Sequence, residues 1–164
     1  MNKINVIYGS TTGATQSAAE TIAKLLDADC VEISNATAES FKAPVLILGT
    51  STWGCGDLQD DWQNGLSLLE NADLSNTKVA LFGQGDQYGF GDTYVNGMAQ
   101  LCQVALSKGA TILGKTSAEG YSHTASEAEQ DGVFCGLALD DSNQADLTDA
   151  RIAAWVEQLK AELG

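Results

Sequence analysis

Positively charged side chains are scarce in this chain. Lysine and arginine together number 8, against 22 aspartate and glutamate residues among 164, and the formal net charge at pH 7 is −14. A surface with this charge repels the phosphates of nucleic acids and of anionic membranes, so neither is expected as a partner. Basic protein surfaces are the natural complement of such a molecule.

Residues that build common metal centres are also few. His123 is the sole histidine, which excludes a multi-histidine metal site, and we expect it to lie solvated in a loop. The cysteines Cys30, Cys55, Cys102 and Cys135 form no Cys-x-x-Cys pair, so neither a zinc ribbon nor an iron–sulfur site is supported. We expect three of them to pack as small apolar residues in strands or a helix.

Long hydrophobic runs are missing as well. No apolar run approaches the roughly 20 residues that span a bilayer, and the N-terminal residues lack a signal-peptide pattern. We therefore expect a cytoplasmic protein. The length suits a single domain over residues 1–164 with a substantial core, and the one proline, Pro44, comes at the start of an expected strand.

Short apolar runs alternate with stretches of helical periodicity along the whole chain. This alternation is typical of a doubly wound α/β fold, in which helices cover both faces of a parallel sheet. Runs that are apolar throughout suit strands buried on both faces. A weak helix is expected at 37–41 and the last one near 152–163. Strands are expected at residues 4–8, 30–33, 45–49, 79–83, 111–114 and 133–139.

A hydroxyl-rich loop lies between the first expected strand and the first helix. It follows the Ile4–Tyr8 run and contains no lysine or arginine. Hydroxyl groups and the free N–H groups of a helix N-terminus can bind a terminal phosphomonoester without a basic residue. Alternatively, the same residues form only a helix cap, for which they are favoured. The residues concerned are Ser10, Thr11, Thr12, Gly13, Ala14 and Thr15.

Two further loops follow the third and fourth expected strands, at residues 50–57 and 85–92. In open α/β sheets the ligand binds beyond the carboxyl ends of the strands, so the three loops are expected to converge. Both loops place aromatic residues, Trp53 in one and Tyr88 and Phe90 in the other, among glycines. Such a combination favours a flat heteroaromatic ring, although Trp53 could instead pack into the core.

These loops, in this order and spacing, resemble the flavodoxin family over essentially the whole chain. The similar segments are Gly9–Thr15, Thr52–Trp62, Gly85–Gln87 and Gly136–Asp140. The resemblance implies a doubly wound, five-stranded parallel sheet with helices on both faces. Residues from about Lys115 to Val133 are similar to the insertion of the long-chain branch, which interrupts the last strand.

The resemblance also implies a function. The chain would bind FMN non-covalently and act as a low-potential one-electron carrier, passing through oxidised, neutral semiquinone and anionic hydroquinone states. It would be a monomer that forms transient complexes with redox enzymes such as flavodoxin or ferredoxin reductases and oxidoreductases. No catalytic or metal-binding residues are expected.

Individual roles follow from the same resemblance. The Ser10–Thr15 loop would hold the phosphate, Thr52 and Ser142 would lie near the ribityl chain, and Trp53 would cover one flavin face. Many family members have tyrosine where this chain has Phe90, so either Phe90 or Tyr88 could cover the outer face. The flavin-contacting residues of the second and third loops would be Thr50, Ser51, Thr52, Trp53, Gly54, Cys55, Gly56, Gly85, Asp86, Tyr88, Gly89, Phe90 and Asp92.

An FMN-dependent NAD(P)H or quinone oxidoreductase on the same fold is the main alternative. Such an enzyme needs a basic site for its nucleotide, yet no basic residue occurs between Lys42 and Lys78 or between Lys78 and Lys108. The acidic residues in those spans raise the free energy of an anionic reduced flavin, which lowers the second reduction potential. A dinucleotide-binding domain is disfavoured because residues 9–13 do not form Gly-x-Gly-x-x-Gly.

Overall fold

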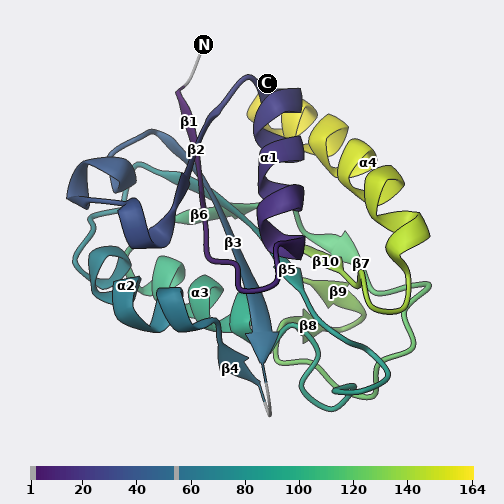
Figure 1. Ribbon diagram of the computed structural model, residues 1–164. Coiled ribbons are helices and arrows are strands. Elements are labelled where there is room, and N and C mark those ends of the chain that lie inside the picture. Colours follow the sequence, from purple (N-terminus) through teal and green to yellow (C-terminus); the bar gives the residue numbers. More distant parts are fainter. Residues whose placement is uncertain (1–2, 54–55) are drawn as a thin grey trace.

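The computed structural model describes residues 3–53 and 56–164, with the backbone alone at Trp53. A central sheet contains parallel strands in the order β10, β5, β3, β1, β2 (Figure 1). Its strands are β1 (Ile4–Tyr8), β2 (Asp29–Glu32), β3 (Val45–Trp53), β5 (Lys78–Gln84), β6 (Thr111–Leu113) and β10 (Leu137–Leu139), and the two-residue β4 (Asp57–Leu58) pairs antiparallel with β3. The expected doubly wound parallel sheet is confirmed.

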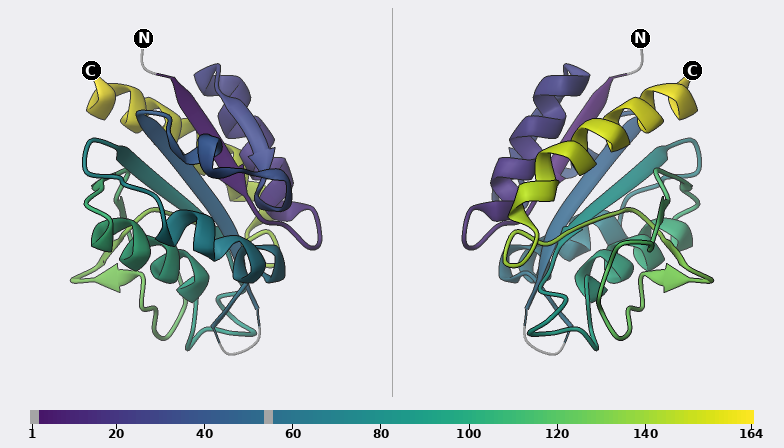
Figure 2. Two further views of the ribbon diagram at one scale, coloured as in Figure 1. Left: turned by 90° about the vertical axis from the view of Figure 1, so that its left-hand side faces the viewer. Right: turned by 90° about the vertical axis from the view of Figure 1, so that its right-hand side faces the viewer.

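Four helices pack on this sheet in two layers, as Figure 2 shows from both sides. One layer contains α1 (Ala14–Leu26) and α4 (Ala145–Leu163), and the other contains α2 (Asp60–Glu70) and α3 (Asn96–Ser107). The weak helix expected at 37–41 is present as a short 3₁₀ turn, η2 (Ala38–Phe41), after η1 (Ile33–Asn35). Among the described residues, no helix is long and apolar enough to cross a membrane.

Alternate strand residues separate the core into two halves. Ile47 in β3 packs with the α1 and α4 layer, whereas Leu46 and Leu48, its neighbours, pack with α2 and α3. All three side chains are fully buried, because successive side chains of a strand point to opposite faces and both faces are covered here. The apolar run in the sequence is thus the direct result of two-sided burial.

The fifth strand position is shared by two short strands. β6 pairs with the amino half of β5, at Lys78–Ala80, and β10 pairs with its carboxyl half, at Phe82–Gln84. The chain between them leaves the main sheet and forms a small antiparallel sheet of β7 (Thr116–Ser117), β9 (Val133–Phe134) and β8 (Glu129–Gln130). The expected interruption of the last strand is confirmed.

One expected strand, 133–139, is in fact two strands in different sheets. Val133 and Phe134 belong to β9, and the chain passes Gly136 before β10 begins. A Cβ atom on Gly136 would lie 2.1 Å from the carbonyl oxygen of Leu81. The continuous apolar pattern could not reveal this change of sheet, because Phe134 in β9 and the residues of β10 are both buried, each by different partners.

The expectation that His123 is solvated is also wrong. Its side chain is only 6% exposed and its imidazole Nε2 contacts the Glu129 carboxylate. The ring packs against Tyr94 and Phe134, with centroid separations of 5.2 Å to each. This aromatic cluster anchors the insertion to the segment that precedes α3. Cys30 departs from expectation too, since it lies in β2 but is exposed.

We expect Gly136→Ala to lower the free energy of unfolding by about 2 to 3 kcal/mol, because the new methyl group must displace backbone rather than a flexible side chain. Urea unfolding followed by far-UV circular dichroism measures this change. Gly132→Ala is the matched control: Gly132 has φ +80° with open space around it, so only backbone strain of about 1 kcal/mol is expected. Equal losses would show that the contact with Leu81 is easily relieved.

Candidate functional site

A cleft of about 150 Å³ opens at the carboxyl ends of the parallel strands. The loops after β1, β3, β5 and β10 form its walls, as expected for an open α/β sheet. Its lining residues are Thr12, Ala14, Thr15, Ser51, Thr52, Gln84, Gly85, Asp86, Phe90, Asp141 and Ser142. The three loops expected to converge therefore do so.

The first wall is the hydroxyl-rich loop and the start of α1. Gly13 occupies the N-cap position with φ 95° and provides no side chain, so the helix begins without a side-chain cap. The first N–H groups of an α-helix have no partner within it and can bind an anion. Thr12 is exposed, Thr15 is buried, and both line the cleft beside these groups. Ser10 instead accepts a hydrogen bond from the Gly13 N–H (3.1 Å).

A buried glutamine that sequence reasoning missed fixes this loop in place. The Gln59 amide donates to the Thr11 hydroxyl at 3.1 Å, while its oxygen accepts a hydrogen bond from the Trp62 N–H at the start of α2. A side chain on Gly9 would collide with the Gln59 amide oxygen, 2.3 Å from the position of a Cβ atom. Gln59 is the N-cap residue of α2, so its position directly before a helix was the signal in the sequence that could have identified it.

The second wall is the end of β3 and its short return strand. β3 runs on beyond residue 49 because Thr52 pairs with Leu58 in β4. The Thr52 hydroxyl accepts a hydrogen bond from the Gly97 N–H at the start of α3 (2.9 Å). Thr50 is fully buried and does not line the cleft, and its hydroxyl donates to the Ser51 carbonyl. Gly56 has φ 97° and is buried.

Part of this loop falls outside the described residues. Gly54 and Cys55 are not described, and neither is the side chain of Trp53. The proposed roles of these three residues therefore stay predictions.

Two polar atoms in the cleft are buried without a partner. The Ser51 hydroxyl and the Gln84 amide nitrogen each lack a hydrogen bond to any described residue. Gln84 is oriented by its own oxygen, which accepts from the Asp141 N–H at 3.3 Å, and this leaves its amide donor for the cleft. An unpaired buried polar group costs about 1 to 3 kcal/mol, so these atoms indicate a polar ligand. Gln84 was missed because it is the last residue of β5, directly before the loop at 85–92, and Asp141 because its contribution is a backbone N–H.

The third wall is organised by Asp86. Its carboxylate accepts hydrogen bonds from the Gly89 N–H (2.7 Å), the Tyr88 N–H (3.1 Å) and the Asn143 amide (2.7 Å). These hydrogen bonds lower the pKa of Asp86 below its usual value, and the bond from the Gly89 N–H contributes most. The resulting turn leaves Phe90 on the cleft and Tyr88 turned out, 65% exposed. Asp92 is exposed at the rim and does not line the cleft.

A family model described as flavodoxin matches residues 6–155. The flavodoxin of Trichodesmium erythraeum is 45% identical over 170 residues, which covers 100% of this chain and 99% of that protein. The chain belongs to the flavodoxin family. The flavodoxin of Helicobacter pylori is 38% identical over 98% of both chains. The flavodoxin of Fusobacterium nucleatum, solved bound to flavin mononucleotide, has a TM-score of 0.93, with 32% identity over 99% of both chains.

Charge is distributed unevenly over this flavodoxin-family chain. Most of its basic residues precede strands or end helices, which places them at the edge of the sheet opposite the cleft (Figure 1). These residues are Lys3, Lys24, Lys42, Lys78, Lys108 and Lys160. Some carboxylates pair with these lysines, as Asp29 does with Lys3 and Glu39 with Lys42. Others follow strands or begin α2, around the cleft. They are Asp57, Asp60, Asp61, Asp86, Asp92 and Asp141.

The depressed pKa of Asp86 gives a prediction about pH. Compared with Asp86→Asn, which retains the shape but not the charge, the wild-type chain should be more stable. The advantage is fully present above the unfolded pKa of about 3.9 and is lost as pH falls through the lower folded pKa. Urea unfolding of both proteins over an acid series measures it. A difference independent of pH would mean that the charge of Asp86 does not hold the loop.

Proposed function

We propose that this chain carries electrons one at a time on FMN bound non-covalently in the cleft. The observation that carries the proposal is one cleft that combines an uncapped helix N-terminus with two buried unpartnered donors, Ser51 and Gln84. The uncapped helix N-terminus suits a phosphate, and the two donors suit the oxygen and nitrogen acceptors of a polar ligand. When bound, FMN supplies reversible one-electron redox chemistry. FMN in the related Fusobacterium nucleatum structure supports the proposal.

We assign the phosphate to the Ser10–Thr15 loop. Here the hydroxyls of Thr12 and Thr15 and the first N–H groups of α1 would neutralise the anion without a lysine or arginine. Thr52 and Ser142 line the same cleft and would contact the ribityl chain.

Phe90 is our choice for the outer flavin face, because it lines the cleft whereas Tyr88 does not. An apolar ring at 47% exposure can stack on a flavin without offering it a hydrogen bond. Trp53, at the carboxyl end of β3, stays our proposal for the other face. Gly85 supports this arrangement, since a Cβ atom there would lie 3.0 Å from the Tyr94 ring and crowd the loop.

An electron carrier is favoured over an NAD(P)H or quinone oxidoreductase. Such an enzyme needs cationic groups for its nucleotide beside the flavin, and none of the described residues that line the cleft is basic. The carboxylates around the cleft disfavour a second anionic ligand there and lower the potential at which the flavin takes up its last electron.

The same carboxylates suit transient docking of redox enzymes. We propose that partners present basic patches to the acidic end of the molecule, where the flavin edge would lie closest to their own cofactor. Attraction between opposite charges accelerates encounter, and the concentration of basic residues at the end opposite the cleft orients the approach. A small, polar contact of this kind forms and dissociates quickly, as a shuttling monomer requires.

Binding should discriminate FMN from riboflavin. Thr12→Ala and Thr15→Ala should each weaken FMN binding by about 1 kcal/mol, through loss of a hydrogen bond to a charged phosphate. The same variants should leave riboflavin affinity unchanged, because riboflavin has no phosphate. Fluorescence titration of the apoprotein measures both ligands.

Thr21→Ala is the matched control, since the Thr21 hydroxyl bonds the Ser17 carbonyl on the same helix away from the cleft. Equal affinities of the wild-type chain for the two flavins would refute the phosphate assignment. Parallel losses for FMN and riboflavin in Thr12→Ala would show that this hydroxyl contacts another part of the ligand.

Electron transfer to a basic reductase should slow as salt rises, because the Debye length is about 10 Å at 0.1 M ionic strength. Replacing Asp57 and Asp92 with asparagine should flatten the salt dependence, since both are exposed near the cleft. Replacing Glu157 and Glu162 with glutamine removes the same charge from the far end of α4 and should flatten it less. Stopped-flow rates over a salt series decide the matter, and identical slopes would mean that total charge alone guides encounter.

A further inference from the structure

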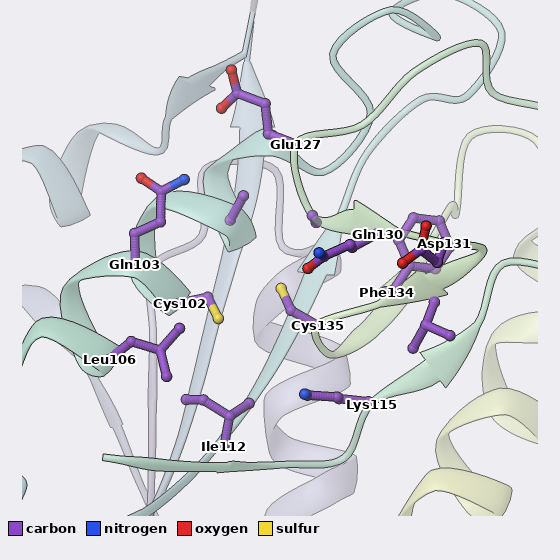
Figure 3. Close-up of a pocket in the computed structure, with 13 residues that line it drawn as sticks. Cys102, Gln103, Leu106, Ile112, Lys115, Glu127, Gln130, Asp131, Phe134 and Cys135 are labelled. Carbon is purple, nitrogen blue, oxygen red and sulfur yellow. The ribbon is translucent and has the colours of Figure 1, made fainter. Parts of the chain in front are cut away.

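A second hollow, of about 710 Å³, lies between α3 and the small sheet of the insertion (Figure 3). It shares no lining residue with the cleft. Leu106 and Val133, 55% and 41% exposed, stand at its rim, and the buried Phe134 lies at its floor. Its volume is within the range of small-molecule sites, so small solutes can enter it.

Two cysteines from separate elements meet in this hollow. Cys102 belongs to α3, and Cys135 lies between β9 and β10, where the insertion returns to the main sheet. Figure 3 shows their sulfur atoms on facing sides of the hollow. Both thiols line the hollow, although Cys102 is buried and Cys135 half-buried. Their reactivity is therefore limited by what enters the hollow.

The surroundings make the two sulfurs unequal. The neighbouring Cys135 thiol and, more weakly, the charge of Lys115 lower the pKa of Cys102, whereas burial opposes this shift. The same pairing and burial raise the pKa of Cys135. An attacking thiolate beside a protonated second thiol is the arrangement that redox-active cysteine pairs use.

We propose that Cys102 and Cys135 form a redox-active thiol pair, which small hydroperoxides entering the hollow oxidise to an intramolecular disulfide. With hydrogen peroxide, the Cys102 thiolate attacks one oxygen, the O–O bond breaks, and the departing hydroxide takes up a proton to become water; an organic hydroperoxide would release an alcohol at this step. The Cys135 sulfur then attacks the sulfenic acid on Cys102, the S–O bond breaks, and a second water leaves with the Cys135 proton. Two thiols lose two electrons in total, and one hydroperoxide gains them.

The bond would join the two walls of the hollow. α3 would be linked covalently to the strand by which the insertion returns, so the insertion could no longer separate from the helix. Because the amino end of α3 bonds Thr52 through the Gly97 N–H, the linked helix also supports a wall of the cleft.

Cys30 provides an internal comparison. It is more exposed, but partial desolvation and the Glu20 carboxylate raise its pKa to about 11. Because the pKa of Cys102 is lowered and that of Cys30 is raised, a larger fraction of Cys102 is thiolate at neutral pH, and Cys102 is expected to react faster than Cys30. The more accessible cysteine is therefore expected to be the slower one.

The test treats the purified protein, in the dark, with limiting hydrogen peroxide and maps the peptides by mass spectrometry without reduction. The expected product is one cross-linked peptide pair containing Cys102 and Cys135, with loss of two hydrogen atoms and full reversal by a dithiol reductant. Cys30→Ser should form the same link at an unchanged rate. Cys102→Ser and Cys135→Ser should form none.

Oxidation of the denatured chain is the control, because the fold no longer positions the cysteines. Disulfides that include Cys30 are expected in that sample. The proposal is overturned if the folded wild-type protein gives links to Cys30 in preference, or leaves Cys102 reduced while Cys30 oxidises. It is also overturned if Cys102 advances to sulfinic acid with Cys135 present, because the second thiol would then have failed to capture the first product. None of these outcomes depends on which flavin the cleft binds.

Discussion

The carboxylate of Asp140 is completely buried, yet it accepts hydrogen bonds from two backbone and two side-chain donors. Gln87 provides one of each, from its N–H at 3.1 Å and its amide at 2.9 Å, and Asn143 provides the others. A buried charge is tolerated only when its lone pairs are satisfied, so these donors must stay where they are. The loop after β5 and the loop after β10 are therefore fixed against one another before any ligand binds.

Gln87 extends this network into the insertion. Its amide also donates to the Gln144 side chain, and its oxygen accepts from the Ser122 N–H. Asn143 links the same network to Asp86, which sets the turn that leaves Phe90 on the cleft. The shape of one wall of the cleft thus depends on one carboxylate that contacts no solvent.

Much of the fold could be predicted from the sequence because parallel strands such as β3 must be apolar on both faces. The hydroxyl-rich loop was equally visible, because a helix N-terminus has limited ways to satisfy its N–H groups. The division of 133–139 between two sheets could not be predicted, since burial leaves the same apolar signature whichever partner provides it. The buried side chain of His123 was unpredictable for a related reason: its aromatic neighbours are distant in the sequence.

The polar framework of the cleft was the least predictable part. Gln59, Gln84 and Gln87 are buried amides, and nothing in local sequence distinguishes them from exposed glutamines. Their roles arise only when separate loops converge, because each amide bridges groups that are far apart along the chain. Ser51 and Phe90 were identified as loop residues, but only the folded chain distinguishes the positions of Phe90 and Tyr88.

The concentration of lysines at one edge of the sheet affects how the whole molecule responds to an electric field. Because most of its lysines lie at the amino edge of the sheet, where they offset carboxylates such as Asp29 and Glu39, the cleft end is the more negative one and the protein has a permanent electric dipole along the strand direction. Near a positively charged electrode it would rotate before it adsorbs, and its cleft would face the metal. The orientation in which the cleft faces the electrode would then be the most populated one, and it is also the one with the shortest distance for electron transfer.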